Sequence, residues 1–387
     1  MKIRMLLILF VMPVWAFAQD VNFFTGSWEE VRAKAKAEGK MILVDAYTYW
    51  CGPCKVMDKT MFHGNQEVAD YINTHFVAYK VECEHDAGVA FARKYKVNVY
   101  PTLLFFNSNG ELLEKHLGYN SDQQEFLKGF KEMVDMDQTN VYAIDHKQME
   151  MPWPDFYIKY FKDANDSTWK RDRSVDANVW LDQQSDLFSE TVWSVIYMYT
   201  LNDKYTNYFL NNLNEYKSRY KFEAADKVNN IVYSYLDKSI KEKNPDYFAK
   251  AESLLRAHSL NPEAEVFYLR INYYQSLQDY ASLAQLLDAQ IAAKEEVSLG
   301  LVNDLAWSIY EGCEDVVVLK KAVAWFEPFL KDMDDYNAMD TYAALLFKTK
   351  DYKQAETWAE KAIAQGKQDG MDVKLTEALL EQIKAAK

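Results

Sequence analysis

Two cysteines lie three residues apart in the run Trp50-Cys51-Gly52-Pro53-Cys54, directly after a short apolar segment. That segment, residues 41–46, has the length and composition of a buried parallel strand. Cysteines at this spacing fit within one helical turn, where a disulfide can close and reopen by exchange. The chain is therefore expected to pass from a strand into a helix here, with both sulfur atoms near the start of the helix.

Helical and strand patterns alternate from residue 27 to residue 136. Ser27 and Glu30 form a capping box, and Gly39 ends the helix that they begin. The β-α-β spacing requires parallel pairing through a right-handed crossover, and a turn at 107–110 adds an antiparallel hairpin. We expect an α/β domain with a central mixed sheet flanked by helices. The expected helices are 27–38, 51–62, 67–73, 87–95 and 122–136, the last capped by Ser121, and the expected strands are 41–46, 76–82, 102–106 and 111–116.

Strand signals stop after about residue 140, and Met151-Pro152-Trp153-Pro154 marks a break. The dense aromatic residues that follow have helical spacing, which favours a role in a core over a binding groove. Helices then pair in units separated by roughly 30 to 40 residues, which is typical of stacked helical hairpins. We expect an all-α helical-repeat region after the α/β domain. The expected divisions are a leader at 1–18, the α/β domain at 19–138, a helical linker at 139–240 and helical hairpins at 241–387.

The first residues have the pattern of a secretory signal peptide. Lys2 and Arg4 precede an apolar run, Met5–Trp15, that is too short to span a bilayer. Residues 16–18, Ala-Phe-Ala, supply a small-x-small cleavage site, so the exported chain would begin at Gln19. A retained N-terminal anchor is the alternative. We expect a bacterial protein of the periplasm or another extracytoplasmic compartment, with no stable membrane insertion after cleavage.

The chain is acidic, with 44 Lys and Arg against 58 Asp and Glu and a formal net charge of −14. Such a charge repels nucleic acid and anionic lipid, so neither is expected as a partner. Pro and Gly are scarce, at 8 and 12 residues, which favours a mostly helical protein. The oligomeric state is left open.

The cysteine pair is the candidate catalytic group. A cysteine at a helix N-terminus is stabilised as the thiolate, so Cys51 is expected to be the accessible attacking sulfur and Cys54 the resolving one. No cofactor is expected besides the redox-active disulfide itself. Cys83 and Cys313 are expected to be buried thiols, since a bridge between them would have to join two domains. Zinc would need two more ligands, and the histidines nearby in sequence form no second pair with suitable spacing.

Other residues are placed to support this chemistry. Asp45 ends the apolar strand, where a buried carboxyl has a raised pKa and can accept the Cys54 proton; a residue that only terminates the strand is the alternative. Lys80 on the next strand is a candidate partner for Asp45. Pro53 fixes the turn between the cysteines. Pro101, after Tyr100 at a strand entrance, is a candidate for a cis peptide bond, which would free the Tyr100 backbone to pair with an extended substrate.

The stretch from about residue 24 to 134 resembles thioredoxin. The resemblance rests on Val44-Asp45, Trp50-Cys51-Gly52-Pro53-Cys54-Lys55, Lys80, Tyr100-Pro101-Thr102 and Asn109-Gly110. It implies a thioredoxin-like fold. By position it implies Cys51 as nucleophile, Cys54 as resolving thiol, Asp45 as buried relay, Pro101 as the cis-proline beside the disulfide and Trp50 as a cap on the site.

The chain also departs from thioredoxin. Lys59 stands where thioredoxin has a helix-kinking proline, and the run 54–62 is more similar to the periplasmic reductase domain of membrane thiol:disulfide interchange proteins. Tyr100 is unusual before the proline, whereas Gly52-Pro53 resembles the reducing members of the family. The C-terminal third resembles tetratricopeptide repeats, best at 340–364. The two-part layout resembles exported thioredoxin-family proteins of the Bacteroidetes.

These features support one leading hypothesis and two alternatives. The first is an exported thiol–disulfide oxidoreductase that reduces or reshuffles protein disulfides, is served by a reducing or oxidising partner protein, and uses its helical half for recruitment. The second is a helical-repeat scaffold whose thioredoxin part is a docking module. The third is a disulfide isomerase.

Overall fold

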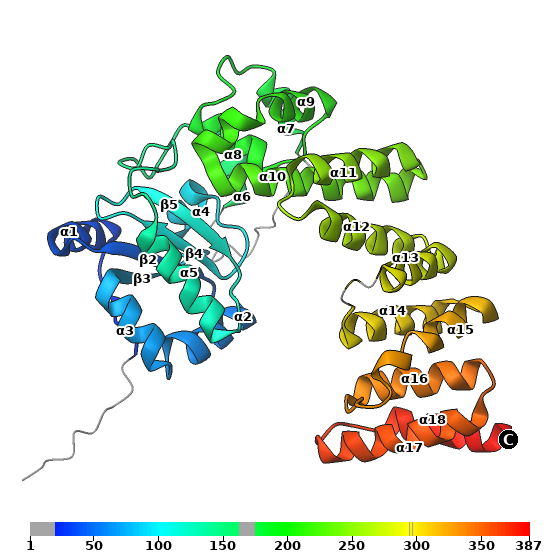
Figure 1. Cartoon of the computed structure of the whole chain (residues 1–387). Helices are drawn as coiled ribbons and strands as arrows, with labels where there is room; N and C mark the ends of the chain where they lie inside the picture. The colour runs from blue at the N-terminus through cyan, green and yellow to red at the C-terminus, as the bar shows by residue number, and fades with distance from the viewer. Residues whose placement is uncertain (1–19, 162–174, 294, 296) are drawn as a thin grey trace, which may run out of the picture. The chain divides into compact units, whose positions relative to one another are not determined.

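The computed structural model describes residues 20–161, 175–293, 295 and 297–387. The leader expected at 1–18 therefore lies outside the described residues. The chain divides into two compact units, Met1–Val228 and Asn229–Lys387. Figure 1 shows a sheet with surrounding helices in the first and a succession of helices in the second.

A five-stranded mixed sheet forms the centre of the first unit, with strand order β1-β3-β2-β4-β5. β1 and β2 both pair with β3 in parallel, whereas β4 pairs antiparallel with both β2 and β5. The mixed sheet expected from the sequence is confirmed. The strand β1 was not predicted, because two residues carry no readable alternation. The strands are β1 (Phe23–Phe24), β2 (Met41–Tyr47), β3 (Phe76–Glu82), β4 (Thr102–Phe106) and β5 (Leu112–Leu117).

Helices of the sheet domain begin and end largely where the sequence signals predicted. The capping box of Ser27 and Glu30 is present, and Gly39 ends that helix with φ of 66°. The predicted cap Ser121 is wrong: the carboxylate of Asp122 accepts the Gln124 and Glu125 N–H groups instead. The helix after the cysteines continues as a π-helix. The helices are α1 (Trp28–Glu38), α2 (Gly52–Met57), the π-helix η1 (Asp58–Phe62), α3 (Gln66–His75), α4 (Ala87–Tyr95) and α5 (Gln123–Asp135).

The sheet buries apolar side chains on both faces. Leu43 and Phe105 pack with Phe62, Ile72 and Phe130, which come from η1, α3 and α5. On the opposite face the rings of α1 and α4 meet β4; these are Trp28, Phe91, Tyr95 and Phe106. Full burial of one such side chain is worth about 1.5–3 kcal/mol, so the sheet gives the loops at its edge a rigid support.

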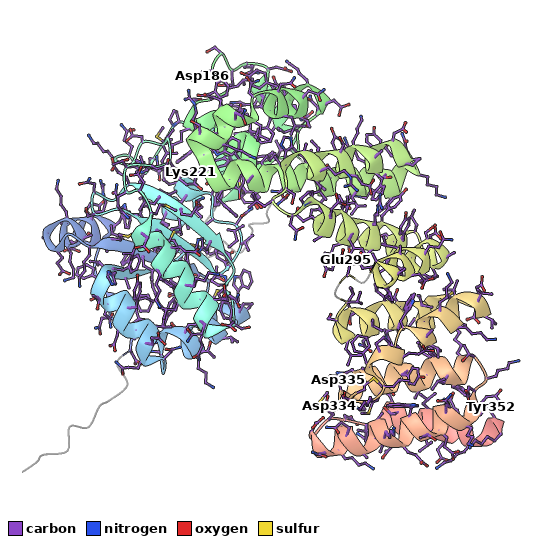
Figure 2. All side chains as sticks on the ribbon, viewed as in Figure 1. Asp186, Lys221, Glu295, Asp334, Asp335 and Tyr352 are labelled. Carbon is purple, nitrogen blue, oxygen red and sulfur yellow. A yellow bond between two sulfur atoms is a disulfide. The ribbon has the colours of Figure 1, made fainter. Side chains whose placement is uncertain are left out.

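After α5, the described residues of the first unit form a loop and then further helices. These helices are α6 (Asp155–Tyr160), α7 (Ala177–Leu181), α8 (Glu190–Met198), α9 (Asp203–Asn211) and the first part of α10 (Leu213–Glu242). Lys221, labelled in Figure 2, has non-helical φ and ψ of 46° and −117° and breaks α10. This part of the chain packs against the sheet domain. The N–H of Tyr142, which precedes α6, bonds to the Leu112 carbonyl, and the Tyr157 hydroxyl of α6 donates to the Arg93 carbonyl, both at 2.9 Å.

Buried charges join this helical segment to the sheet domain. The Glu223 carboxylate pairs with Lys96 at 3.4 Å and with Lys115, and it accepts the Trp193 indole N–H at 2.6 Å. Burial alone would raise the pKa of Glu223, but the two ammonium groups outweigh it and lower that pKa. The carboxylate is therefore charged at neutral pH, and it balances lysines that belong to the sheet domain.

The second unit consists of helices packed in succession, as Figure 1 shows. The all-α region expected after the α/β domain is confirmed, and the pair of helices at 340–364 extends from Tyr336 to Gln368. The helices are α11 (Pro245–His258), α12 (Pro262–Ser276), α13 (Tyr280–Ala292), α14 (Leu299–Gly312), α15 (Val316–Ala324), the 3-10 helix η2 (Glu327–Phe329), α16 (Tyr336–Lys348), α17 (Tyr352–Gln368) and α18 (Lys374–Ala386). In the described residues, no strand follows β5.

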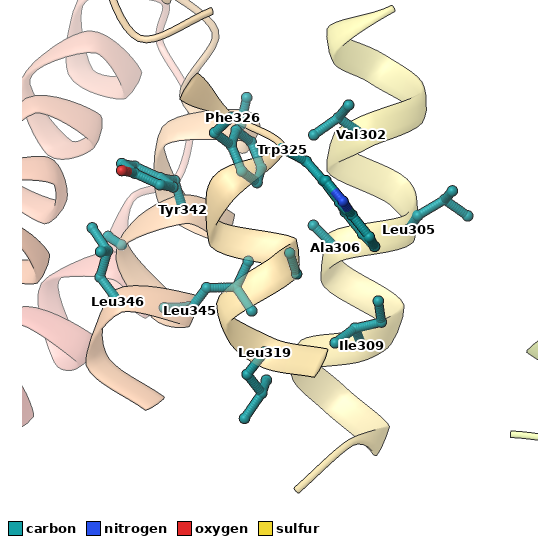
Figure 3. Packing of buried hydrophobic residues seen from close by; sticks show 14 of the residues in the cluster. Val302, Leu305, Ala306, Ile309, Leu319, Trp325, Phe326, Tyr342, Leu345 and Leu346 are labelled. Carbon is teal, nitrogen blue, oxygen red and sulfur yellow. The ribbon is translucent and has the colours of Figure 1, made fainter. Parts of the chain in front are cut away.

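A continuous apolar core runs through these helices. Figure 3 shows Ala306 and Ile309 of α14 beside Leu319 of α15, with Phe326 and Tyr342 further along the same cluster. Four small residues of one helix pair are fully buried: Ala343 of α16 and Ala355, Ala359 and Ala362 of α17. Membership of the tetratricopeptide family and the domain divisions stay predictions.

Candidate active site

The cysteine pair lies between the end of β2 and the first turn of α2. Cys51 is the N-cap of α2, and Pro53 occupies the first turn, where a missing N–H costs nothing. The two sulfur atoms form a disulfide. The Cys54 backbone N–H points at the Cys51 sulfur over 3.1 Å. That donor and the helix N-terminus would stabilise a thiolate on Cys51 after reduction.

The accessibility predicted for Cys51 is wrong for this disulfide form. Cys51 is 2% exposed and Cys54 is 5% exposed. The bond holds the Cys51 sulfur against Cys54, while the side chains before it, Tyr49 and Trp50, are 62% and 65% exposed. The surface around the disulfide is therefore aromatic, and the sulfur atoms lie beneath it.

Trp50 is held by two contacts beside the disulfide. Its ring meets the Tyr100 ring edge-on, with centroids 5.9 Å apart. Its indole N–H donates to Glu84 over 2.7 Å. Glu82 accepts the Tyr49 backbone N–H at 3.3 Å. Neither glutamate was predicted; their position at or just after the end of β3, next to the end of β2, was the available signal.

Pro101 enters β4 through a cis peptide bond after Tyr100, as the sequence suggested. The next residue, Thr102, pairs with Ala46 of β2, so Pro101 lies at the sheet edge from which the chain leaves for the cysteines. The Pro101 carbonyl accepts the Gly118 N–H at 2.7 Å. Pairing of the Tyr100 backbone with an extended substrate stays a prediction.

Asp45 is a buried carboxyl, 2% exposed. It lies two residues after Leu43 on β2, so the two side chains point to the same face of the sheet, the face that packs against η1. Burial raises its pKa to about 7, with Lys80 opposing the shift and Asp58 adding to it. Among the described residues, its Oδ1 atom has no hydrogen-bond partner. The predicted raised pKa is confirmed, whereas its role as a proton relay stays a prediction.

Lys80 is the predicted partner of Asp45, and its Nζ lies 3.8 Å from the Asp45 Oδ2. A closer partner was missed: Lys80 also pairs with Asp58. Asp58 follows Cys54 by four residues, which places it about one helical turn further on. An acidic residue at that spacing was the sequence signal that could have identified it.

Comparison with known proteins agrees with this geometry. The family model described as "Thioredoxin-like domain" matches residues 28–133. This part of the chain is a thioredoxin-like domain.

Relatives of the thioredoxin-like domain match only part of the chain. Thioredoxin-T of Drosophila melanogaster is 33% identical over 22% of this chain and 51% of its own length. Thiol:disulfide interchange protein DsbD of Pseudoalteromonas atlantica is 32% identical over 22% of this chain and 14% of its own. A solution structure from Bacteroides thetaiotaomicron, assigned in its name as a disulphide-isomerase, is 42% identical over 32% of this chain and 99% of that one, with a TM-score of 0.29. The chain thus spans about half or less of the length of the first curated relatives.

The other two cysteines are buried free thiols, as predicted. Burial raises the pKa of the Cys83 thiol well above its usual value, so this thiol is protonated and unreactive at neutral pH. In the described part of the chain, no group of three or more His, Cys, Asp or Glu side chains could hold a metal ion. The same residues contain no helix long and apolar enough to cross a membrane.

The buried carboxyl makes the stability of the thioredoxin-like domain depend on pH. Asp45 has a pKa of about 7 when folded and about 3.8 when exposed, so the unfolded chain loses its proton first. The free energy of unfolding is therefore expected to fall as pH rises from about 4 to 7. Asp45→Asn should remove this dependence and stabilise the domain at pH 8 by up to about 4 kcal/mol. Urea unfolding at pH 4 and pH 8 measures the effect, with the exposed Asp70→Asn as a control; equal pH dependence in wild type and Asp45→Asn would contradict it.

Proposed function

We propose that this chain is an exported thiol–disulfide oxidoreductase that reduces or reshuffles disulfides of other proteins through Cys51 and Cys54. The observation that carries the proposal is the Cys51–Cys54 disulfide at a helix start, with the Cys54 N–H directed at the Cys51 sulfur. The curated relatives of the same domain include a protein named for thiol:disulfide interchange. Export rests on the leader pattern of residues 1–18.

The reaction follows from the two cysteines. In the reduced protein, the Cys51 thiolate attacks a substrate disulfide, forms a mixed disulfide and displaces one substrate thiolate. Cys54 then loses its proton and attacks the Cys51 sulfur, which breaks the mixed disulfide and releases the second substrate thiolate. The substrate gains two electrons and the cysteine pair loses two. A protein thiol pair must return these electrons before the next cycle.

Asp45 is the candidate acceptor of the Cys54 proton. A general base works best when its pKa is near the working pH, and the pKa of this buried carboxyl is about 7. It can therefore take up a proton during resolution and give it up afterwards. We expect the resolution rate to rise as pH passes upward through about 7, because only the ionised carboxyl can accept the proton.

Replacing the resolving sulfur is expected to trap substrates. In Cys54→Ser the mixed disulfide at Cys51 cannot be released intramolecularly. Disulfide-linked adducts with substrate proteins should therefore accumulate, and dithiothreitol should cleave them. Non-reducing gels of extracts from the exported compartment, followed by mass spectrometry, would identify them. The matched control is Cys51→Ser/Cys54→Ser, which should carry none. A Cys54→Ser chain without dithiothreitol-sensitive adducts would contradict the proposed reaction.

We also propose that the helical second unit recruits protein partners. Its surface carries exposed large apolar side chains, among them Trp307, Val317 and Leu375. The scaffold alternative rests on the same unit, and it predicts that partners remain bound in the double cysteine variant. If the double cysteine variant recovers no partner protein, the scaffold alternative is excluded.

The isomerase alternative is favoured by the name of the Bacteroides thetaiotaomicron relative. Refolding of a substrate with scrambled disulfides by the reduced chain tests this alternative.

A further inference from the structure

A chain of alternating charges leads from the buried carboxyl of the active site to the protein surface. Asp45 Oδ2 lies 3.8 Å from Lys80 Nζ, which also pairs with Asp58 Oδ1. The second oxygen of Asp58 lies 3.5 Å from His63 Nε2, and His63 Nδ1 lies 3.0 Å from an oxygen of Asp20. Side-chain exposure rises along this order: 2%, 28%, 32%, 46% and 55%. The charges form a continuous path from the protein interior to water.

The π-helix η1 brings two members of this path together. The His63 N–H bonds to the Asp58 carbonyl at 2.9 Å, which closes the wide turn that begins at Asp58 and ends at His63. A π-turn inserted into an α-helix often lies at a functional site, and here it follows the redox cysteines directly. The wider turn places Asp58 between Lys80 on one side and His63 on the other.

Lys80 is held between the two carboxylates by aromatic rings. Its Nζ lies 4.7 Å from the ring centroid of Phe23, 5.7 Å from that of Tyr47 and 5.9 Å from that of Phe62. Cation–π attraction from three rings keeps the ammonium in this position. Lys80 can therefore share its charge between Asp45 and Asp58 without leaving the site.

The charged and titratable groups around Asp45 come from three elements. Lys80 belongs to β3, Asp58 to η1 and Tyr47 to β2, and the Cys83 thiol follows β3. On the other side, the β4 residue paired with Asp45 is the apolar Leu103. Lys80 is the cation among these groups, and Asp58 is the anion that competes with Asp45 for it. The way the Lys80 ammonium is shared between the two carboxylates therefore changes the electrostatic potential at Asp45.

We propose that Asp58 is a positioning residue of the redox site: it competes with Asp45 for the Lys80 ammonium and so governs how readily Asp45 takes up the proton that Cys54 releases. His63 and Asp20 extend this control to the surface. The His63 ring lies against the second oxygen of Asp58, so it holds Asp58 and leaves more of the Lys80 ammonium to Asp45. The inference rests on the proposed oxidoreductase function.

The test is the titration of Asp45 in the oxidised full-length protein, read by carboxyl ¹³C NMR and assigned with Asp45→Asn. Asp58→Asn is expected to lower the titration midpoint of Asp45 by about one pH unit, because the Lys80 ammonium then pairs with Asp45 alone. Lys80→Met is expected to raise it by about one unit, and His63→Gln to raise it by a smaller amount. The exposed Asp70→Asn and Lys59→Met are matched controls for the two charge changes and should leave the midpoint unchanged. The pH profile of insulin reduction should move in the same direction as the midpoint.

An unchanged midpoint in Asp58→Asn, or a shift in the same direction as in Lys80→Met, would overturn the proposal. If Lys80→Met fails to fold, Asp58→Asn and His63→Gln still decide it, because both of these side chains lie nearer the surface. The titration needs no turnover. A chain that never reduces insulin would therefore refute the proposed function, while a fixed midpoint in an active chain would refute only the role of Asp58.

Discussion

Cys51→Ser is expected to reduce insulin disulfides no faster than buffer with dithiothreitol alone, while its far-UV circular dichroism matches that of the wild type. The serine hydroxyl is not ionised at neutral pH and cannot displace a thiolate from a disulfide, so the first step is lost and not merely slowed. The fold should persist because serine is close in size to cysteine and is itself a favoured N-cap residue, the position that Cys51 holds at the start of α2. Turbidity of precipitating insulin B chain measures the rate.

Cys83→Ala is the matched control for this variant. Cys83 is also buried, but its thiol is free and is held protonated by burial. Its loss should leave the rate of insulin reduction within about a factor of two, since the thiolate is the nucleophile. Wild-type activity in Cys51→Ser, or equal loss in both variants, would end the assignment of Cys51 as the attacking sulfur.

Glu223→Gln is expected to destabilise the first unit by about 3–5 kcal/mol, because it removes one partner of a buried ion cluster and leaves the others uncompensated. Lys96 and Lys115 have side-chain exposures of 1% and 3%, so water cannot replace the lost carboxylate. The amide keeps the shape of the side chain but carries no charge. The free energy of unfolding, from urea denaturation followed by near-UV circular dichroism, measures the effect.

The control for the buried cluster is Glu215→Gln, which breaks an exposed pair with Arg219 at 2.6 Å. Exposed pairs within one helix contribute about 0.3–0.5 kcal/mol, so this variant should unfold close to the wild type. If Glu223→Gln were as mild as Glu215→Gln, the buried charges would not stabilise the packing of the helical segment on the sheet domain.

The sheet and the redox loop could be predicted from the sequence because their signals are local. The run 41–46 is continuous and apolar, as a strand buried on both faces requires, and the capping box of Ser27 and Glu30 lies within four residues. The position of Cys51 and Cys54 at a helix start follows from the turn residues between them. Such features depend on neighbours in the chain and need no knowledge of the fold.

The features that were missed depend on contacts between distant segments. Glu223 meets Lys115 across 108 positions of the chain, and a single glutamate on a helix carries no sign that it is buried. The sequence pattern around Asp58 is that of an exposed helical residue, whereas in the structure η1 places Asp58 against Lys80. The burial of Cys51 was missed because the exposure of a side chain depends on the packing around it, which spacing alone does not fix.

The most direct test of the account is a count of free thiols in the full-length protein, made by alkylation under denaturing conditions and located by mass spectrometry. The oxidised protein should be alkylated at Cys83 and Cys313 alone. Dithiothreitol should add Cys51 and Cys54 together, and re-oxidation should remove both while the circular dichroism stays constant. If Cys51 and Cys54 are alkylated in all three states, or are protected from alkylation in all three, the result would contradict a reversible disulfide at this site.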